Sequence, residues 1–186
     1  MKKFELTNEF ITNMFGTKLF RIRALVEFGD VEAGELGGYV EKESNLGHDD
    51  NAWVYDNAWV YGDAQVSGDA LVYGNAWVYG DAQVSGDARV YGNARVCGDA
   101  RVCGNGDYAY AHGFGSVNRT TTFFRLKDGG VGVRCGCFYG TLAQFRDKIR
   151  ETHGESAIAE EYLDLAALME KRFRRTGNEQ KTEEES

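Results

Sequence analysis

The strongest constraint on the fold of this chain is a six-residue repeat that runs without a gap from Asn51 to Gly104. The unit Asn/Asp-Ala-x-Val-x-Gly occurs nine times in succession, and only Asp56 replaces the glycine. Ala and Val are two residues apart, so on a strand they share one face. Gly followed by Asp or Asn suits a turn with positive φ. Each repeat is therefore predicted to be a very short strand and a corner, which must stack on its neighbours.

The variable positions repeat every 18 residues, which is three hexads. Like residues recur at this interval, and the hexad alone does not require it. The columns after Val are Tyr55-Tyr73-Tyr91, Tyr61-Tyr79-Cys97 and Ser67-Ser85-Cys103, and those after Ala include Trp59-Trp77-Arg95 and Trp53-Leu71-Arg89. We therefore expect three hexads to close one triangular coil, and residues 51–104 to form three coils spaced ~4.8 Å apart.

The flanking segments are predicted to close the open ends of the coils, because an open coil end is an unpaired strand edge. Residues 1–50 read as an N-terminal β cap. Residues 105–175 read as an appendage with a loop to residue 118, a β-hairpin over 120–138 and two helices. The first helix begins at a capping box of Thr141 and Gln144, and the second covers 156–175. Residues 176–186 read as a disordered acidic tail.

The repeat resembles the hexapeptide repeat of left-handed β-helix proteins, in which an aliphatic residue is followed by a small one four positions later, as Val54 is by Ala58. The flanks resemble the caps of a family of phage- and prophage-encoded hexapeptide-repeat proteins, in residues 20–25, 28–31, 36–40 and 43–46 at the N-terminal end and 133–138, 140–142 and 151–154 at the C-terminal end. The resemblance implies a mainly β fold with a short left-handed parallel β-helix, in a bacterial or phage cytoplasmic protein. It implies no particular activity.

The overall charge disfavours several classes of partner. The formal net charge is −8, without a basic block, which argues against direct nucleic-acid binding and against anionic membrane surfaces. No apolar run approaches the ~18 residues of a membrane span. The segment Met1–Glu9 lacks the apolar core of a signal peptide. We therefore expect a cytoplasmic protein with four reduced cysteines.

Metal binding and catalysis receive weaker support from the sequence. Cys135 and Cys137 are expected on one strand face, where His153 could join them around a metal, but a single Cys-x-Cys pair is a weak signal. We therefore expect no metal and no other cofactor. Hexapeptide-repeat proteins include acetyltransferases that use a histidine base between subunits. His112 is the best candidate for such a base, and this acyltransferase reading is an alternative to a non-catalytic protein.

The aromatic columns predict an interface or a binding site, because they should point outward from a thin prism. We expect interface burial on at least one side, in a homotrimer by preference or a dimer. The interface candidates are Trp53, Trp59, Trp77, Tyr55 and Tyr61. Arginines beside tyrosines suit a phosphate-bearing, nucleotide-like ligand, and the ligand candidates are Arg89, Arg95, Arg101, Tyr73, Tyr79 and Tyr91.

Three hypotheses for function follow from these features. The first is a non-catalytic, oligomeric phage protein that acts against host defence, either by sequestering a nucleotide-like ligand or by occupying a host defence protein. The second is the acyltransferase with His112 as base. The third is an acidic mimic of nucleic acid, built on the acidic tail and the corner residues Asp63, Asp81 and Asp99.

Overall fold

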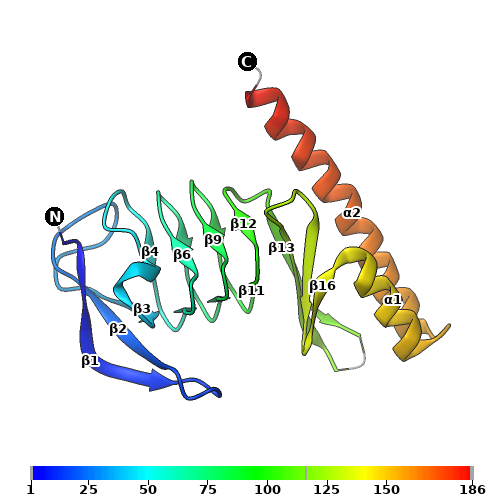
Figure 1. Cartoon of the computed structure of the whole chain (residues 1–186), viewed down its shortest axis with the longest axis horizontal. Coiled ribbons are helices and arrows are strands. Elements are labelled where there is room, and N and C mark those ends of the chain that lie inside the picture. The colour runs from blue at the N-terminus through cyan, green and yellow to red at the C-terminus, as the bar shows by residue number, and fades with distance from the viewer. Residues whose placement is uncertain (1, 116, 185–186) are drawn as a thin grey trace. The chain divides into compact units, whose positions relative to one another are not determined.

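The structure is a computed structural model that describes residues 2–115 and 117–184. The chain divides after Asn105 into two units, each described here by itself (Figure 1). The N-terminal unit contains a parallel β-solenoid with a β cap. The C-terminal unit contains a four-stranded antiparallel sheet and two helices. The predicted mainly β fold, with stacked parallel coils, a β cap and a strand–helix appendage, is therefore confirmed.

The nine hexads form nine two-residue strands, each made of the third and fourth residues of its repeat. The strands are β4 (Trp53–Val54), β5 (Trp59–Val60), β6 (Gln65–Val66), β7 (Leu71–Val72), β8 (Trp77–Val78), β9 (Gln83–Val84), β10 (Arg89–Val90), β11 (Arg95–Val96) and β12 (Arg101–Val102). Every third strand pairs in parallel, so three sides form, with the orders β4-β7-β10, β5-β8-β11 and β6-β9-β12. The register joins residues 18 apart, such as Trp53 with Leu71 and Leu71 with Arg89.

The solenoid core consists of the Ala and Val of every repeat, which are at most 1% exposed. The corners need the left-handed backbone that glycine adopts without strain. At Gly86, φ is 60°, and an added Cβ would lie 2.2 Å from the carbonyl oxygen of Cys103 in the next coil. Asp56, the one residue that replaces a repeat glycine, has a φ of 53°. The hexad therefore encodes both the filling of the core and the bend.

The solenoid begins one coil earlier than the repeat predicts. Strand β3 (Leu36–Val40) pairs in parallel with β5, with Val40 opposite Val60, and Leu46 forms a parallel bridge with Val66. Within this irregular coil, η1 (Glu43–Asn45) ends in a fully buried asparagine. The Asn45 Nδ2 donates to the carbonyl oxygens of Gly62 and Ala64, at 3.0 and 2.8 Å. The coil escapes the hexad pattern because Asn45 and Leu46, rather than an Ala-x-Val unit, fill its interior.

The N-terminal β cap is a hairpin of β1 (Phe4–Thr12) and β2 (Lys18–Ala24). Strand β2 pairs antiparallel with β3, so one side of the solenoid extends into a six-stranded sheet with the order β1-β2-β3-β5-β8-β11. Phe4 and Phe28 meet the indole of Trp53 edge-on, at centroid distances of 6.2 and 5.3 Å. The cap therefore covers the first regular coil with aromatic side chains.

Lys3 is a buried cation in this cap. It is 3% exposed, and its Nζ donates to the carbonyl oxygens of Asp50 and Ala52, at 3.2 and 2.9 Å. The ammonium also lies 4.6 Å from the centre of the Phe28 ring. Burial lowers the pKa of Lys3 from 10.5 to about 8, while nearby aspartates, Asp50 first, act in the opposite direction. The folded protein therefore loses this proton at a lower pH than the unfolded chain does.

We expect the Lys3 contribution to stability to rise between about pH 8 and 10.5, because the unfolded state binds one more proton there. The free energy of unfolding of the wild-type protein should increase relative to that of Lys3→Met as the pH rises through this interval. Urea denaturation of both proteins on either side of pH 8 measures the difference, in which the titrations of other groups cancel. A difference that stays constant with pH would contradict the burial of a proton-releasing Lys3.

The C-terminal unit contains more strands than the predicted hairpin. Its sheet has the order β13 (Tyr108–Phe114), β14 (Arg119–Arg125), β15 (Val131–Cys135) and β16 (Phe138–Thr141). The loop predicted over 105–118 is therefore wrong for β13, whose alternating large and small residues are typical of a strand. The predicted return strand ends at Cys135, because Gly136 (φ 56°) and Cys137 form a turn into β16. Cys135 and Cys137 consequently do not share a strand face.

Two helices complete the unit, α1 (Leu142–His153) and α2 (Ala157–Glu184). The predicted capping box is confirmed: Thr141 Oγ1 accepts from the Gln144 backbone N–H, and the Gln144 side chain accepts from the Thr141 N–H. The apolar residues at helical spacing are mostly buried, whereas Leu168 is 59% exposed. The buried ones are Leu142, Phe145 and Ile149 of α1 and Tyr162, Leu165, Met169 and Phe173 of α2. Helix α2 continues from the predicted end at residue 175 into the segment predicted as a disordered tail; residues 185–186 of that tail lie outside the described residues.

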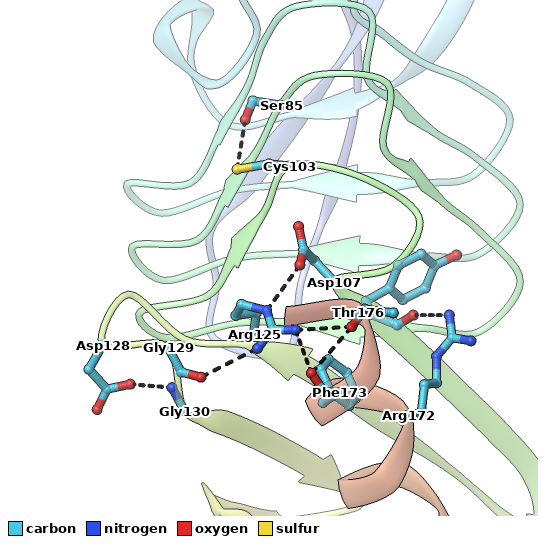
Figure 2. A network of polar contacts seen from close by, with 11 residues as sticks. Ser85, Cys103, Asp107, Arg125, Asp128, Gly129, Gly130, Arg172, Phe173 and Thr176 are labelled. Atoms are coloured by element: carbon cyan, nitrogen blue, oxygen red, sulfur yellow. Dashed lines mark hydrogen bonds and ion pairs between the residues drawn. The ribbon is translucent and has the colours of Figure 1, made fainter. Parts of the chain in front are cut away.

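A buried polar network surrounds Arg125 in this unit (Figure 2). The Arg125 Nε lies 3.0 Å from Asp107 Oδ1, and the side chains are 16% and 3% exposed. The Arg125 Nη2 donates to the Phe173 carbonyl oxygen and to Thr176 Oγ1, at 3.0 and 3.1 Å. One guanidinium therefore ties β14 both to the segment before β13 and to α2.

Candidate functional site

One side of the solenoid carries four stacked aromatic residues, Trp59, Tyr61, Trp77 and Tyr79, which we call the aromatic face. The rings of Trp59 and Trp77 are 4.5 Å apart with an interplanar angle of 7°. The rings of Tyr61 and Tyr79 are 5.0 Å apart at 2°. Each tryptophan lies two residues before its tyrosine, so both columns project from the same side. All four residues are partly exposed.

An arginine covers one end of the tryptophan column. The Arg95 guanidinium lies 4.2 Å from the centre of the Trp77 ring, which is cation–π geometry. At the other end Tyr39 pairs with Trp59 in the sheet register, and the Arg21 guanidinium lies 5.2 Å from the Tyr39 ring. The Arg21 Nη1 donates to Tyr39 Oη at 3.0 Å. Sequence reasoning missed Arg21 and Tyr39, because Tyr39 precedes Trp59 by 20 residues instead of 18.

The stacking decides what the aromatic face can offer a ligand. Trp77 has Trp59 against one ring face and Arg95 against the other. Two rings 4.5 Å apart leave no room for a third ring between them. The tryptophans therefore present their edges outward, and these suit packing against a surface better than stacking on a nucleobase.

The interface candidates do not all lie on the surface. Trp53 is fully buried beneath the cap, so its predicted exposure is wrong. The N-terminal cap reaches this side of the first coil, and the column position alone did not reveal that. Tyr55 is partly buried, and this burial raises the pKa of its hydroxyl. Trp59, Trp77 and Tyr61 are partly exposed on the aromatic face, in agreement with the prediction that they point outward.

The ligand candidates divide among three sides of one copy. Arg89 belongs to β10, beside the stacked pair Tyr73 and Tyr91, whose rings are 5.2 Å apart at 13°. Arg95 lies on β11, on the same side as Tyr79. Arg101 lies on β12, on the third side, and its Nη1 donates to the carbonyl oxygens of Asp81 and Ala100, both at 2.9 Å. The three arginines therefore lie on three different sides of the coil and cannot contact one small ligand together.

The catalytic and metal candidates lie in the C-terminal unit. His112 is exposed on β13, and its Nδ1 lies 2.8 Å from Thr120 Oγ1. Cys135, Cys137 and His153 line one cavity. Across residues 2–115 and 117–184, however, no cluster of three or more His, Cys, Asp or Glu has the geometry of a metal site.

That cavity is a second candidate site, and sequence reasoning missed it. It has a volume of about 270 Å³ and lies where the ends of β14 and β15 approach α1 and Tyr162 of α2. Its charged lining residues are Arg119 and Lys148, with His153 beside them. One signal was available in the sequence: Lys148 and Thr152 are spaced as i and i+4, so both face the cavity from one side of α1. The strand ends that complete the cavity come from distant segments.

Comparison with known proteins supports the solenoid. Residues 64–80 and 82–98 match the family model described as YdcK beta solenoid repeat. No curated protein matches the chain. Among the described residues, no helix is both long and apolar enough to cross a membrane. The match falls on consecutive coils of the observed solenoid, and the chain is a β-solenoid repeat protein.

Proposed function

We propose that this chain is a non-catalytic binding protein that assembles as a homo-oligomer through its aromatic face. The observation that carries the proposal is the pair of stacked columns Trp59–Trp77 and Tyr61–Tyr79 on one side of the solenoid. Trp, Tyr and Arg are the residues most enriched in the energetic centres of protein interfaces. Here the stacked rings and Arg95 hold one another in place, so little side-chain entropy remains to be lost on binding.

A second copy of the chain is the first occupant that we propose for this face. The solenoid suits a homotrimer whose three copies lie parallel around an axis that runs along the solenoid axis, and a dimer is the alternative. We propose that the assembly acts in the cytoplasm of an infected bacterium, a proposal supported by the resemblance to phage-encoded hexapeptide-repeat proteins. There it would act against host defence by occupying a host protein. Outward ring edges favour this version over sequestration of a nucleotide-like ligand.

The other hypotheses receive less support from the geometry. The His112 ring is hydrogen-bonded to Thr120 on an exposed strand, which is an ordinary surface arrangement rather than an acyltransferase cleft. An acidic mimic of nucleic acid needs unneutralised carboxylates, whereas Asp63 forms an ion pair with Lys42 at 2.7 Å. That contact lowers the pKa of the Asp63 carboxyl.

We expect the double substitution Trp77→Ala with Tyr79→Ala to convert the oligomer into monomers, because it removes one ring from each stacked column. The control is Gln65→Ala with Gln83→Ala, which alters exposed polar residues on another side of the solenoid. Native mass spectrometry of the three proteins gives their subunit counts. The wild-type and control proteins should be trimers or dimers, and the aromatic variant should be a monomer with an unchanged circular dichroism spectrum.

Two results would overturn this assignment. A wild-type protein that remains monomeric at micromolar concentration has no homo-oligomer interface of useful strength. An aromatic variant that keeps the wild-type mass has its interface elsewhere. A small-molecule adduct in the wild-type spectrum, lost in Arg95→Ala, would instead favour ligand sequestration.

A further inference from the structure

The cavity in the C-terminal unit has the size of a site for a small molecule. Its volume of about 270 Å³ lies just below the ~300–1,000 Å³ range in which drug-sized ligands bind, so it suits a smaller molecule. Phe138 and Phe145 form an aromatic part of its wall, with ring centroids 5.4 Å apart. Phe145 and Ile149 are 3% and 4% exposed and belong to the core of the unit. The apolar wall is thus held rigidly by the fold.

The charged groups that line the cavity are all of one sign. Arg119 and Lys148 line it, and no carboxylate does so among the described residues. Within that part of the chain, no carboxylate lies at ion-pair distance from Arg119 either. Two acidic residues lie near without lining the cavity: Glu151 pairs with Lys148 at 2.8 Å, and Glu161 accepts from the Gly115 backbone N–H at 2.7 Å. Lys148 therefore shares its charge with Glu151, and the Arg119 guanidinium is the lining cation that favours an anion inside the cavity.

Tyr162 contributes an uncharged polar group to the lining of the cavity. Tyr162 is 5% exposed, and its hydroxyl lies 3.9 Å from the Cys135 thiol. Burial and the neighbouring Cys135 raise the pKa of Tyr162 to about 12, so that it remains a phenol. Thr121 Oγ1 donates to Cys135 Sγ at 3.2 Å. Tyr162 therefore offers a hydroxyl without a negative charge that would repel an anion.

We infer that this cavity binds a small organic anion with a planar apolar body. The body packs against Phe138 and Phe145, and the carboxylate or phosphate group pairs with the Arg119 guanidinium, with Lys148 at the rim. A guanidinium suits both groups, because its parallel N–H donors match their oxygens. The site is separate from the aromatic face of the solenoid and does not rest on the proposed oligomer.

The test uses benzoate and its neutral analogue benzamide as probes on the full-length protein. Titration calorimetry should show that benzoate binds at least ~10-fold more tightly than benzamide, because only benzoate gains the charge-assisted hydrogen bonds. Arg119→Gln should remove most of this difference. Arg150→Gln is the matched control, because Arg150 is exposed on α1 and pairs with Asp147 outside the cavity. Phenyl phosphate in place of benzoate distinguishes a phosphate site from a carboxylate site.

A second readout keeps the inference testable even if Arg119→Gln perturbs the fold. Cys137 is exposed and lines the cavity, whereas Cys103 is exposed in the N-terminal unit. Bound benzoate should slow the alkylation of Cys137 by iodoacetamide and leave the rate at Cys103 unchanged. Failure of both benzoate and phenyl phosphate to bind, equal affinity for benzoate and benzamide, or equal protection of the two cysteines would overturn the inference.

Discussion

Replacing Arg125 with methionine is expected to lower the free energy of unfolding of the C-terminal unit by about 3–5 kcal/mol. The substitution keeps an unbranched side chain but leaves the carboxylate of Asp107, which is 3% exposed, without its cation. It also removes the donors to the Phe173 carbonyl oxygen and to Thr176 Oγ1 (Figure 2). A buried charge that loses its countercharge is far more unfavourable than the loss of a surface ion pair.

The sequence provides a clean way to follow this unit. All three tryptophans lie in the solenoid, whereas α1 and α2 lie in the C-terminal unit. Urea denaturation followed by helical circular dichroism should therefore shift for Arg125→Met, while the tryptophan fluorescence transition stays close to that of the wild type. Arg174→Met is the control, because Arg174 forms an exposed i,i+4 pair with Glu170, and its replacement should change stability by less than about 0.5 kcal/mol. Equal shifts in the two variants would show that the Asp107–Arg125 pair does not stabilise the unit.

The regular part of the fold was predictable because one local rule repeats nine times. The spacing of Ala and Val fixed the buried face, and the recurrence at 18 residues fixed the register of the three sides. The same rule hid the coil that precedes Asn51. That coil uses Val40, Asn45 and Leu46 for its interior, and only Val40 matches a repeat position in kind. A search for the hexad pattern therefore misses a coil whose interior is filled by different side chains.

The candidate sites depended more on contacts between distant segments. The stacking of Trp59 on Trp77 follows from the repeat, but the burial of Trp53 depends on Phe4 and Phe28, whose positions the repeat does not specify. In the C-terminal unit, the cavity joins residues of two strand ends and two helices. No spacing along the sequence predicts that these residues line one cavity, because their proximity depends on how the helices pack on the sheet.

Trp53→Ala is expected to destabilise the N-terminal unit by about 3–5 kcal/mol, the range typical of removing a fully buried large aromatic side chain. Trp53 is 0% exposed, and the rings of Phe4 and Phe28 rest against its indole. Removing it leaves a cavity between the cap and the first regular coil. Its indole Nε1 has no hydrogen-bond partner among the described residues, so Trp53→Phe should be much less damaging.

Trp77→Ala is the matched control, because it removes the same side chain from a partly exposed position on the aromatic face. There the loss is one stacked ring pair with Trp59 and one cation–π contact with Arg95, together about 1–2 kcal/mol. Urea denaturation followed by the fluorescence of the remaining tryptophans, at a concentration where the protein is monomeric, compares the two variants. A larger effect at Trp77 than at Trp53 would mean that the stacked rings of the aromatic face stabilise the solenoid more than its cap does. The stacked rings would then be explained by stability alone, and the argument that the aromatic face exists for binding would lose its basis.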